Sequence, residues 1–170
     1  MRTAGVTKEV RMPVKSLPSN PSLEHLKYQA RDLLNAINSV KAHDILVLPN
    51  DKNIILAASQ VQQLTDKNIR VVPTRSVPQG LAALLAFNFQ GDLETNFRVM
   101  NAALSRVRTL ELTNAVRSAH INNVQVLKDK PIALVDGELV AAGHDLGTLL
   151  IEVLHQSGGP ESEIISLYYG

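Results

Sequence analysis

Two polar turns in the sequence carry side chains that could bind an anion. The first reads PNDKN and the second PTRSVPQG, and each directly precedes a segment with helical hydrophobic spacing. A helix N-terminus presents free N–H groups and a partial positive charge, which favour an anion. The candidate ligand- or partner-binding residues in these turns are Asn50, Asp51, Lys52, Asn53, Thr74, Arg75, Ser76, Gln79 and Gly80. Their amide, carboxylate and hydroxyl groups can equally serve only to cap helices and shape turns, and both interpretations stay open.

A third candidate pair lies further along the chain, in the segment AVRSAHINN. Arg117 and His120 fall there at an expected strand end or turn. A histidine beside an arginine could act as an acid–base pair or bind an anion. The alternative interpretation is a turn histidine and an exposed arginine.

The sequence lacks the motifs of several common kinds of functional site. The chain has no GxxxxGK[ST] and no GxGxxG after a strand, so no self-sufficient ATP site is expected. It has no cysteine, and its five histidines show neither HExxH nor a close pair on one helical face. It also lacks a GxSxG nucleophile elbow. We therefore assign no catalytic residue, no metal ligand and no cofactor to this chain.

The elements that must position the two turns are predicted by hydrophobic periodicity. The expected elements are a helix over 22–40, a strand over 44–50, helices over 52–65, 80–88 and 92–108, and a strand over 69–73. The expected helix caps are Ser22 for the first helix, Asn50 or Asp51 for the second, and Asp92 for the helix over 92–108. Strands and helices that alternate with short loops are typical of a right-handed parallel βαβ unit. Because ligands bind beyond the carboxyl ends of parallel strands, both turns are expected at one edge of the sheet.

After Val107 the hydrophobic period changes to two, which predicts strands in TLELTNAVRSA and INNVQVLKD. Asn122-Asn123 and Asp136-Gly137 are expected turns, and the second favours a type I′ hairpin. A helix over 145–157 should end at Gly158, and a strand is expected over 163–169. The predicted fold class is α/β, with a parallel strand–helix core and an additional antiparallel hairpin region.

Composition sets the domain organisation and the class of partner. The chain has 170 residues, 45% of them hydrophobic, with a net charge of +1, which suits a single α/β domain over 22–170. Residues 1–21 are basic and end in SLPSNPS, as expected of an arm or linker, although a short edge strand is an alternative. The near balance of charge argues against nucleic acid. No long apolar run predicts a membrane span, and the expected location is cytoplasmic.

Five segments of the sequence together form a recognisable pattern: ILVLPNDKNIILAASQV, IRVVPTRSVPQGLAALLAFN, NAVRSAHINN, IALVDGELV and SEIISLYYG. In this order they resemble the C-terminal region of the large subunit of fatty acid kinase, which belongs to a dihydroxyacetone-kinase-like family. PN-x-KNI followed by P-[ST]-x-x-x-PQG is its most specific feature, and the likeness covers about residues 20–170. The positions that match the family are Pro49, Asn50, Lys52, Asn53, Pro73, Thr74, Pro78, Gln79, Gly80, Arg117, Asp136 and Gly137.

The resemblance implies a role in a phosphotransfer system. In that family an N-terminal domain holds ATP and magnesium through clustered aspartates, and a middle domain carries a metal-binding cysteine and histidines. The C-terminal region resembles the fold of dihydroxyacetone kinase substrate domains and of DegV-type fatty-acid-binding proteins. It is thought to dock the fatty-acid-binding partner.

The chain departs from the family pattern in ways that bear on activity. No aspartate cluster precedes residue 20, there is no cysteine, and Leu17-Pro18-Ser19 stands where the family has a glycine pair. The family also continues beyond its YYG segment. We therefore expect either an excised fragment or a one-domain relative that does not phosphorylate anything alone.

Two main functions compete at this point. The first is a non-catalytic domain that docks a DegV-type fatty-acid-binding protein or a kinase domain. The second is a small-molecule-binding domain for a carboxylated or phosphorylated metabolite, with Arg75 or Arg117 on the anion. A structural domain that forms homo-oligomers is the remaining alternative.

Overall fold

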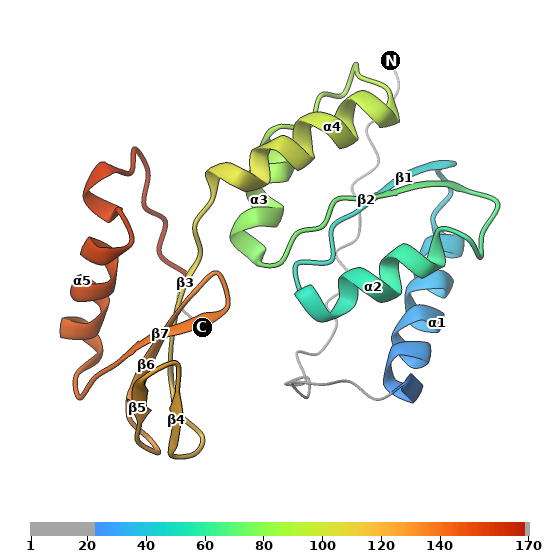
Figure 1. The fold of residues 1–170 in the computed structure, drawn as a ribbon. Coiled ribbons are helices and arrows are strands. Elements are labelled where there is room, and N and C mark those ends of the chain that lie inside the picture. The colour runs from blue at the N-terminus through green and yellow to red at the C-terminus, as the bar shows by residue number, and fades with distance from the viewer. Residues whose placement is uncertain (1–22, 169–170) are drawn as a thin grey trace.

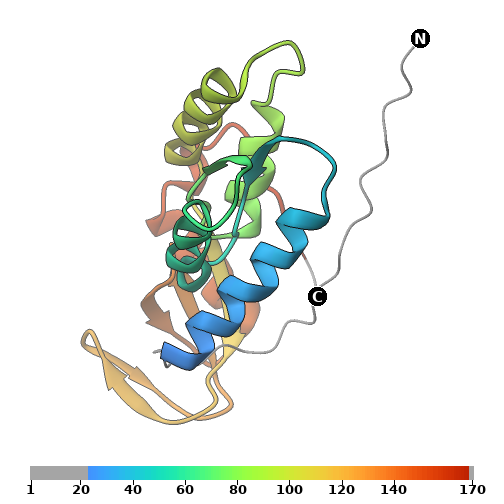
Figure 2. The same cartoon turned by 90° about the vertical axis from the view of Figure 1, so that its right-hand side faces the viewer.

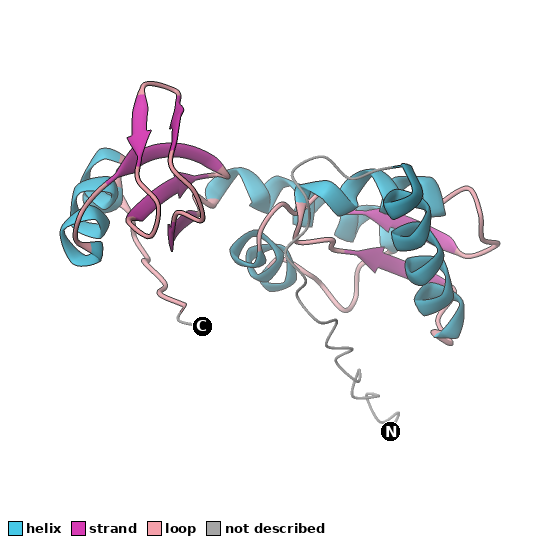
Figure 3. Ribbon diagram, turned by 90° about the horizontal axis from the view of Figure 1, so that it is seen from below, coloured by secondary structure: helices cyan, strands magenta, loops and turns pink. Residues whose placement is uncertain are grey.

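A computed structural model of the chain describes residues 23–168 (Figure 1). The arm or edge strand expected over 1–21 lies outside the described residues, as does Ser22, the expected cap of the first helix. The fold class is confirmed: a parallel strand–helix unit is followed by a unit of antiparallel strands and one helix (Figures 1 and 3).

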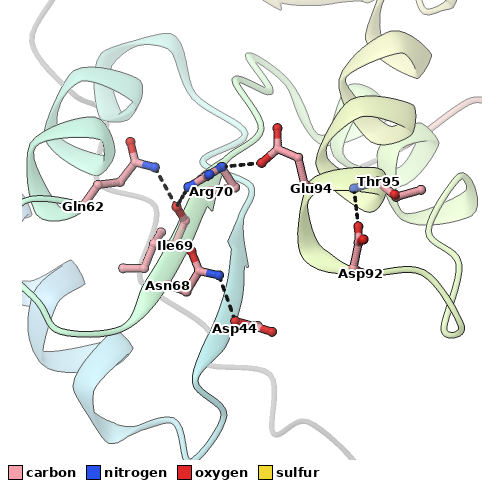
Figure 4. A network of polar contacts seen from close by, with 8 residues as sticks. All are labelled: Asp44, Gln62, Asn68, Ile69, Arg70, Asp92, Glu94 and Thr95. Atoms are coloured by element: carbon pink, nitrogen blue, oxygen red, sulfur yellow. Dashed lines mark hydrogen bonds and ion pairs between the residues drawn. The ribbon is translucent and has the colours of Figure 1, made fainter.

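The first unit contains the predicted parallel βαβ arrangement. Strand β1 (Asp44–Val47) pairs in parallel with β2 (Asn68–Val71), and α2 (Lys52–Val61) connects them. Ile45 lies opposite Ile69 in this register. Polar contacts bind the strands to their neighbours, since Asn68 donates to Asp44 at 3.0 Å and Gln62 donates to the carbonyl of Ile69 at 2.8 Å (Figure 4).

Helices cover both faces of this small sheet. Successive strand residues point to opposite sides, so each face presents apolar side chains that a helix must bury. On one face α1 (Leu23–Ser39) and α2 pack with alternate strand residues. On the other face α3 (Val77–Leu85) and α4 (Leu93–Ala103) pack with the remaining ones. The first cluster contains Ala30, Ile37, Ala57, Val61 and Ile69, and the second contains Val72, Ala83 and Met100. Figure 2 shows these layers from the side.

The second unit is an antiparallel sheet backed by one helix. The sheet has the order β3 (Leu110–Asn114), β6 (Pro131–Val135), β7 (Glu138–Ala142), and α5 (Leu146–Gln156) packs on it. Ala133, Leu149 and Val153 form its buried cluster. A separate hairpin of β4 (Ala119–Ile121) and β5 (Val124–Val126) projects from this unit (Figures 1 and 3). Short 3-10 turns η1 (Leu104–Arg106) and η2 (Gly159–Glu161) follow α4 and α5.

The turns and caps predicted from local chemistry are confirmed. Asp136 and Gly137 both have positive φ, +51° and +84°, as a type I′ turn requires, and Asn122 and Asn123 also have positive φ. Asp92 caps α4 through the N–H of Thr95. Gly158 follows the last turn of α5 at φ +76°.

One expected element and several boundaries were wrong. Residues 163–168 form no strand; no neighbouring strand pairs with them in the described structure, and Ile164 is 83% exposed. The strand expected in TLELTNAVRSA ends at Asn114, where the chain leaves the β3–β6 ladder for the projecting hairpin. Helix α3 begins at Val77 rather than 80, because Ser76 caps it and Pro78 is tolerated in the first turn. Helix α2 ends at Val61, one turn earlier than the sequence predicts.

None of the helices in the described part of the chain has the length and hydrophobicity needed to span a membrane.

Candidate functional site

The candidate site lies at the carboxyl edge of the β1–β2 sheet. Both strands end at this edge because they are parallel, and the chain then turns into α2 after β1 and into α3 after β2. These two helices pack on opposite faces of the sheet, so the connecting loops diverge. A divergence of this kind is where ligands bind in open α/β sheets. We call this region, formed by residues 49–53 and 73–80, the carboxyl edge.

A direct hydrogen bond joins the two loops. The backbone N–H of Asn50 donates to Oγ1 of Thr74 at 2.9 Å, and Thr74 is fully buried. Asn50 has a φ of +56°, in the left-handed region that asparagine tolerates better than most residues. The two turns that the sequence singled out are therefore brought together at one place.

Gly80 fits this arrangement because it has no side chain. It is buried in the first turns of α3, and a Cβ there would overlap Oδ1 of Asn50 and lie 2.8 Å from Cγ of the same side chain. That Oδ1 atom is itself buried and has no hydrogen-bond partner among the described residues. The close approach of α3 to the first loop therefore depends on glycine at position 80.

The loop residues also perform local structural work. Asp51 accepts a hydrogen bond from the N–H of Asn53 at 2.8 Å and caps α2, while Ser76 caps α3 through the N–H of Gln79. The side chain of Gln79 in turn accepts from the N–H of Arg75 at 2.8 Å. Asp51, Ser76 and Gln79 therefore hold the loops in shape. The cationic side chains of Lys52 and Arg75 are exposed to solvent.

The second unit also reaches the carboxyl edge. The hydroxyl groups of Ser76 and Thr109 lie 2.7 Å apart, and Oδ1 of Asp136 accepts from the N–H of Thr109 at 3.0 Å. A Cβ on Gly137 would lie 3.8 Å from Nζ of Lys52, which places the β6–β7 turn beside the start of α2. Sequence reasoning missed Thr109, because a single threonine after a helix carries no recognisable signal.

Lys52 and Arg75 line an open groove of about 540 Å³ on the outer side of α2. Its other lining residues are Asn53, Ile55, Leu56 and Ser59. The two ion pairs within residues 23–168 lie elsewhere, Arg70 with Glu94 at 2.8 Å (Figure 4) and His43 with Asp44 at 3.5 Å. The groove therefore combines two exposed cations with an apolar wall.

Arg117 and His120 are not brought to this edge. Arg117 lies in the bend before β4 and His120 lies on β4, in the projecting hairpin, and both are exposed (Figure 1). Hydrogen bonds tie this region instead to its own hairpin base, where Ala115 and Lys130 pair through their backbones at 2.9 Å. The described structure records no hydrogen bond between the two side chains.

Residues 23–168 gather no group of three or more histidine, aspartate or glutamate side chains that could hold a metal ion. The carboxyl edge offers amide, hydroxyl and cationic groups, which suit an anion or an acidic surface better than a metal.

The fold and the edge define an α/β domain with helices on both faces of a parallel sheet and a polar rim where its strands end. The family model for the C-terminal domain of FakA-like fatty acid kinase proteins matches residues 2–170. This chain therefore belongs to the FakA-like C-terminal family, as the sequence motifs predict.

Two bacterial proteins are similar to most of this chain. The chain is 32% identical over 151 residues to Protein YloV of Bacillus subtilis strain 168, and 32% identical over the same length to an uncharacterized protein of Staphylococcus aureus strain USA300. In both comparisons the match covers 89% of this chain and 26% of the relative. The chain thus spans about a quarter of the length of these proteins.

Proposed function

We propose that this chain is a non-catalytic docking domain of a fatty-acid-kinase-like phosphotransfer system, which presents a DegV-type fatty-acid-binding protein to a kinase domain. ATP and magnesium are then bound by that kinase domain, and no residue of this chain transfers phosphate. Membership in the FakA-like C-terminal family supports this kinase context. The cytoplasmic location expected from the sequence stays part of this proposal.

The proposal rests on the contacts that hold the two loops of the carboxyl edge, and the turn of the second unit, together. Two loops 24 residues apart are joined by the bond from Asn50 to Thr74, and the turn at Gly137 approaches Lys52. The edge thus holds groups from both units in one fixed arrangement. Its groove is open, with Leu56 56% exposed, and such a shallow surface suits a protein better than a small molecule that must be enclosed.

The first experiment measures binding of the purified chain to a DegV-type protein loaded with a long-chain fatty acid, by isothermal titration calorimetry. The proposal predicts a saturable one-to-one complex and no ATP hydrolysis by the chain alone. The same protein is tested without its fatty acid as a comparison. Absence of binding in both forms would contradict the docking function, and so would ATP turnover that is lost in Arg117→Ala.

A second candidate function is favoured by one specific observation. Lys52 and Arg75 line the same groove and take part in neither ion pair of the described residues. Two cations beside the start of a helix could hold a carboxylate or phosphate of a small metabolite. In that case this domain would bind or sense the metabolite by itself.

Thermal-shift screening separates the two functions. The chain is heated with fatty acids, acyl phosphates and triose phosphate analogues, alone and with the DegV-type protein. The docking function predicts a shift only with the protein partner. A rise in the melting temperature with one metabolite, lost in Arg75→Ala, would support the second function instead.

A further inference from the structure

Within the described residues, the chain passes from the first unit to the second only once, between η1 and β3 (Figures 1 and 3). The N–H of Val107 donates to the carbonyl of Leu104 at 3.2 Å, so Val107 still belongs to the first unit. Arg108 already belongs to the second unit, because its guanidinium donates to the carbonyl of Ser157, at the end of α5, at 2.7 Å. The change of unit therefore falls on the peptide bond between Val107 and Arg108. Val107 has φ −108° and ψ 125°, in the broad extended region where both angles can change without a clash.

Thr109 is tied to the β6–β7 turn of the second unit. The N–H of Thr109 donates to Oδ1 of Asp136 at 3.0 Å, and the N–H of Asp136 donates to the carbonyl of Thr109 at 2.9 Å. The same turn contains Gly137, which lies beside Lys52 of the first unit. A rotation of the second unit therefore carries this turn toward the groove or away from it.

Little holds the two units to each other beyond this link. Their buried apolar residues form separate clusters, and neither ion pair of the described residues joins them. Of the hydrogen bonds between described residues, only the one between the hydroxyls of Ser76 and Thr109, 2.7 Å apart, crosses from one unit to the other. Thr109 is 6% exposed, so this bond is shielded from water. Two units of one chain move relative to each other unless a large apolar interface joins them.

We propose that the two units form a hinge, in which the second unit rotates as one body about the Val107–Arg108 peptide and the bond between Ser76 and Thr109 is the latch. The structure shows the closed arrangement, with the β6–β7 turn beside Lys52. Opening breaks one neutral hydrogen bond, which changes an equilibrium constant by roughly twofold to tenfold. A partner that contacts both the groove and the turn stabilises the closed arrangement, a step that rests on the proposed docking function.

Distances between two spin labels test the hinge, because the native chain contains no cysteine that would be labelled as well. Gln60→Cys on α2 and Glu152→Cys on α5 place one label at an exposed position of each unit. We expect two populations of distances, the minor one rising roughly twofold to tenfold when Thr109→Val removes the hydroxyl of the latch. Thr113→Val, the same substitution at an exposed position of β3, is the matched control and should change neither population. One distance shared by all variants, or an equal change in Thr113→Val, would overturn the hinge.

A disulfide across the latch tests which arrangement binds the partner. Ser76→Cys/Thr109→Cys places two thiols where the native hydroxyls lie 2.7 Å apart, close enough for oxidation to join them. The oxidised form should bind the fatty-acid-loaded DegV-type protein at least as tightly as the wild type, and the reduced form should bind severalfold more weakly. Tighter binding by the reduced form would contradict the closed arrangement as the docking form. If the wild type itself does not bind, the docking function fails, whereas the label distances still decide whether the hinge exists.

Discussion

At the scale of single residues, Thr74 holds the two loops of the carboxyl edge together. Its hydroxyl oxygen is the acceptor for the N–H of Asn50, and its side chain is completely buried beneath that loop. Asn50 in turn adopts a left-handed backbone conformation and lies against Gly80. Asn50 precedes Thr74 by 24 residues, yet it contacts both Thr74 and the position of Gly80.

Replacing Thr74 by valine keeps the shape of the side chain and removes the acceptor. We expect Thr74→Val to lower the free energy of unfolding by about 1–2 kcal/mol, because the N–H of Asn50 loses its partner in a partly buried position. Urea denaturation measures this. The control is Thr113→Val on an exposed position of β3, which should change stability little. Equal stability of both variants would show that the bond does not hold the loops.

Gly80 and Gly147 give a matched pair, since both lie in the first turns of a helix. A Cβ at Gly80 would collide with the side-chain amide of Asn50, whereas one at Gly147 would meet Oδ2 of Asp145 at an ordinary 3.4 Å. We expect Gly80→Ala to destabilise the chain by about 1–3 kcal/mol and to displace the first loop. Gly147→Ala should be neutral or stabilising by up to about 1 kcal/mol. Chemical denaturation of the two variants measures both unfolding free energies, and equal values would contradict the close approach of α3 to the first loop.

The residue types of the site could be predicted from sequence, but their roles could not. Polar turns before helices indicated both loops, and the resemblance pointed to the same positions. Nothing in the pattern distinguished Thr74, which is buried as an acceptor, from Arg75, which is exposed. Local spacing fixes which side chains lie near a helix N-terminus, whereas burial depends on how the second loop packs.

At the scale of elements, two aspartates cap helices by the same geometry. Asp92 accepts from the N–H of Thr95 at 2.7 Å, and Asp145 accepts from that of Thr148 at 2.8 Å. These backbone hydrogen bonds, followed by those of the threonine side chains, hold the pKa of each carboxyl below its ordinary value. The negative charge of each carboxylate also stabilises its helix, α4 or α5, because it lies beside the partial positive charge of the helix N-terminus.

A lowered pKa in the folded chain makes the caps depend on pH. The stabilising effect is present above the unfolded-state pKa of aspartate and is lost as the pH falls through the lower folded-state pKa. The double variant Asp92→Asn/Asp145→Asn keeps a capping side chain without the charge. We expect it to be less stable than the wild type at pH 7, with the difference vanishing in strong acid. Urea unfolding at several pH values measures this, and Asp66→Asn is the control. A difference independent of pH would contradict the role of charge.

Element types were predictable wherever local chemistry and burial agreed. The Asp136-Gly137 turn and the cap at Asp92 are examples, because their backbone geometry is encoded in one or two residues. The expected strand over 163–169 failed for the opposite reason. Its β-branched and aromatic residues favour a strand, but a strand also needs a neighbour to pair with, and residues 163–168 have none in the described structure.

At the scale of the whole molecule, two units with separate buried clusters meet beside the carboxyl edge. The first is built around β1 and β2, and the second around β3, β6 and β7. The hydroxyl contact between Ser76 and Thr109 and the approach of Gly137 to Lys52 link them there. This junction could not be predicted from sequence, because the hydrophobic periodicity of each unit specifies its own elements and not how the two units pack together.

Loosening this junction should affect binding more than stability. Thr109→Val removes the hydroxyl that contacts Ser76 but leaves its backbone bond to Asp136. We expect the unfolding free energy to fall by only about 1 kcal/mol, since one hydrogen bond is lost. The affinity for the fatty-acid-loaded DegV-type protein should fall severalfold, because the second unit no longer fixes the edge. Calorimetric titration measures the affinity, and an unchanged affinity would show that the junction is unrelated to docking.

The most direct test of the docking function is the affinity of a variant with reversed charge at the carboxyl edge. Lys52→Glu/Arg75→Glu changes two exposed side chains that line the groove, and Lys41→Glu/Arg106→Glu makes the same change in net charge elsewhere on the surface. Titration with the fatty-acid-loaded DegV-type protein should give a dissociation constant raised at least about tenfold for the first variant, and little changed for the second. If the wild type binds the partner and the two variants bind it with equal affinity, the assignment of this edge as the docking surface is contradicted.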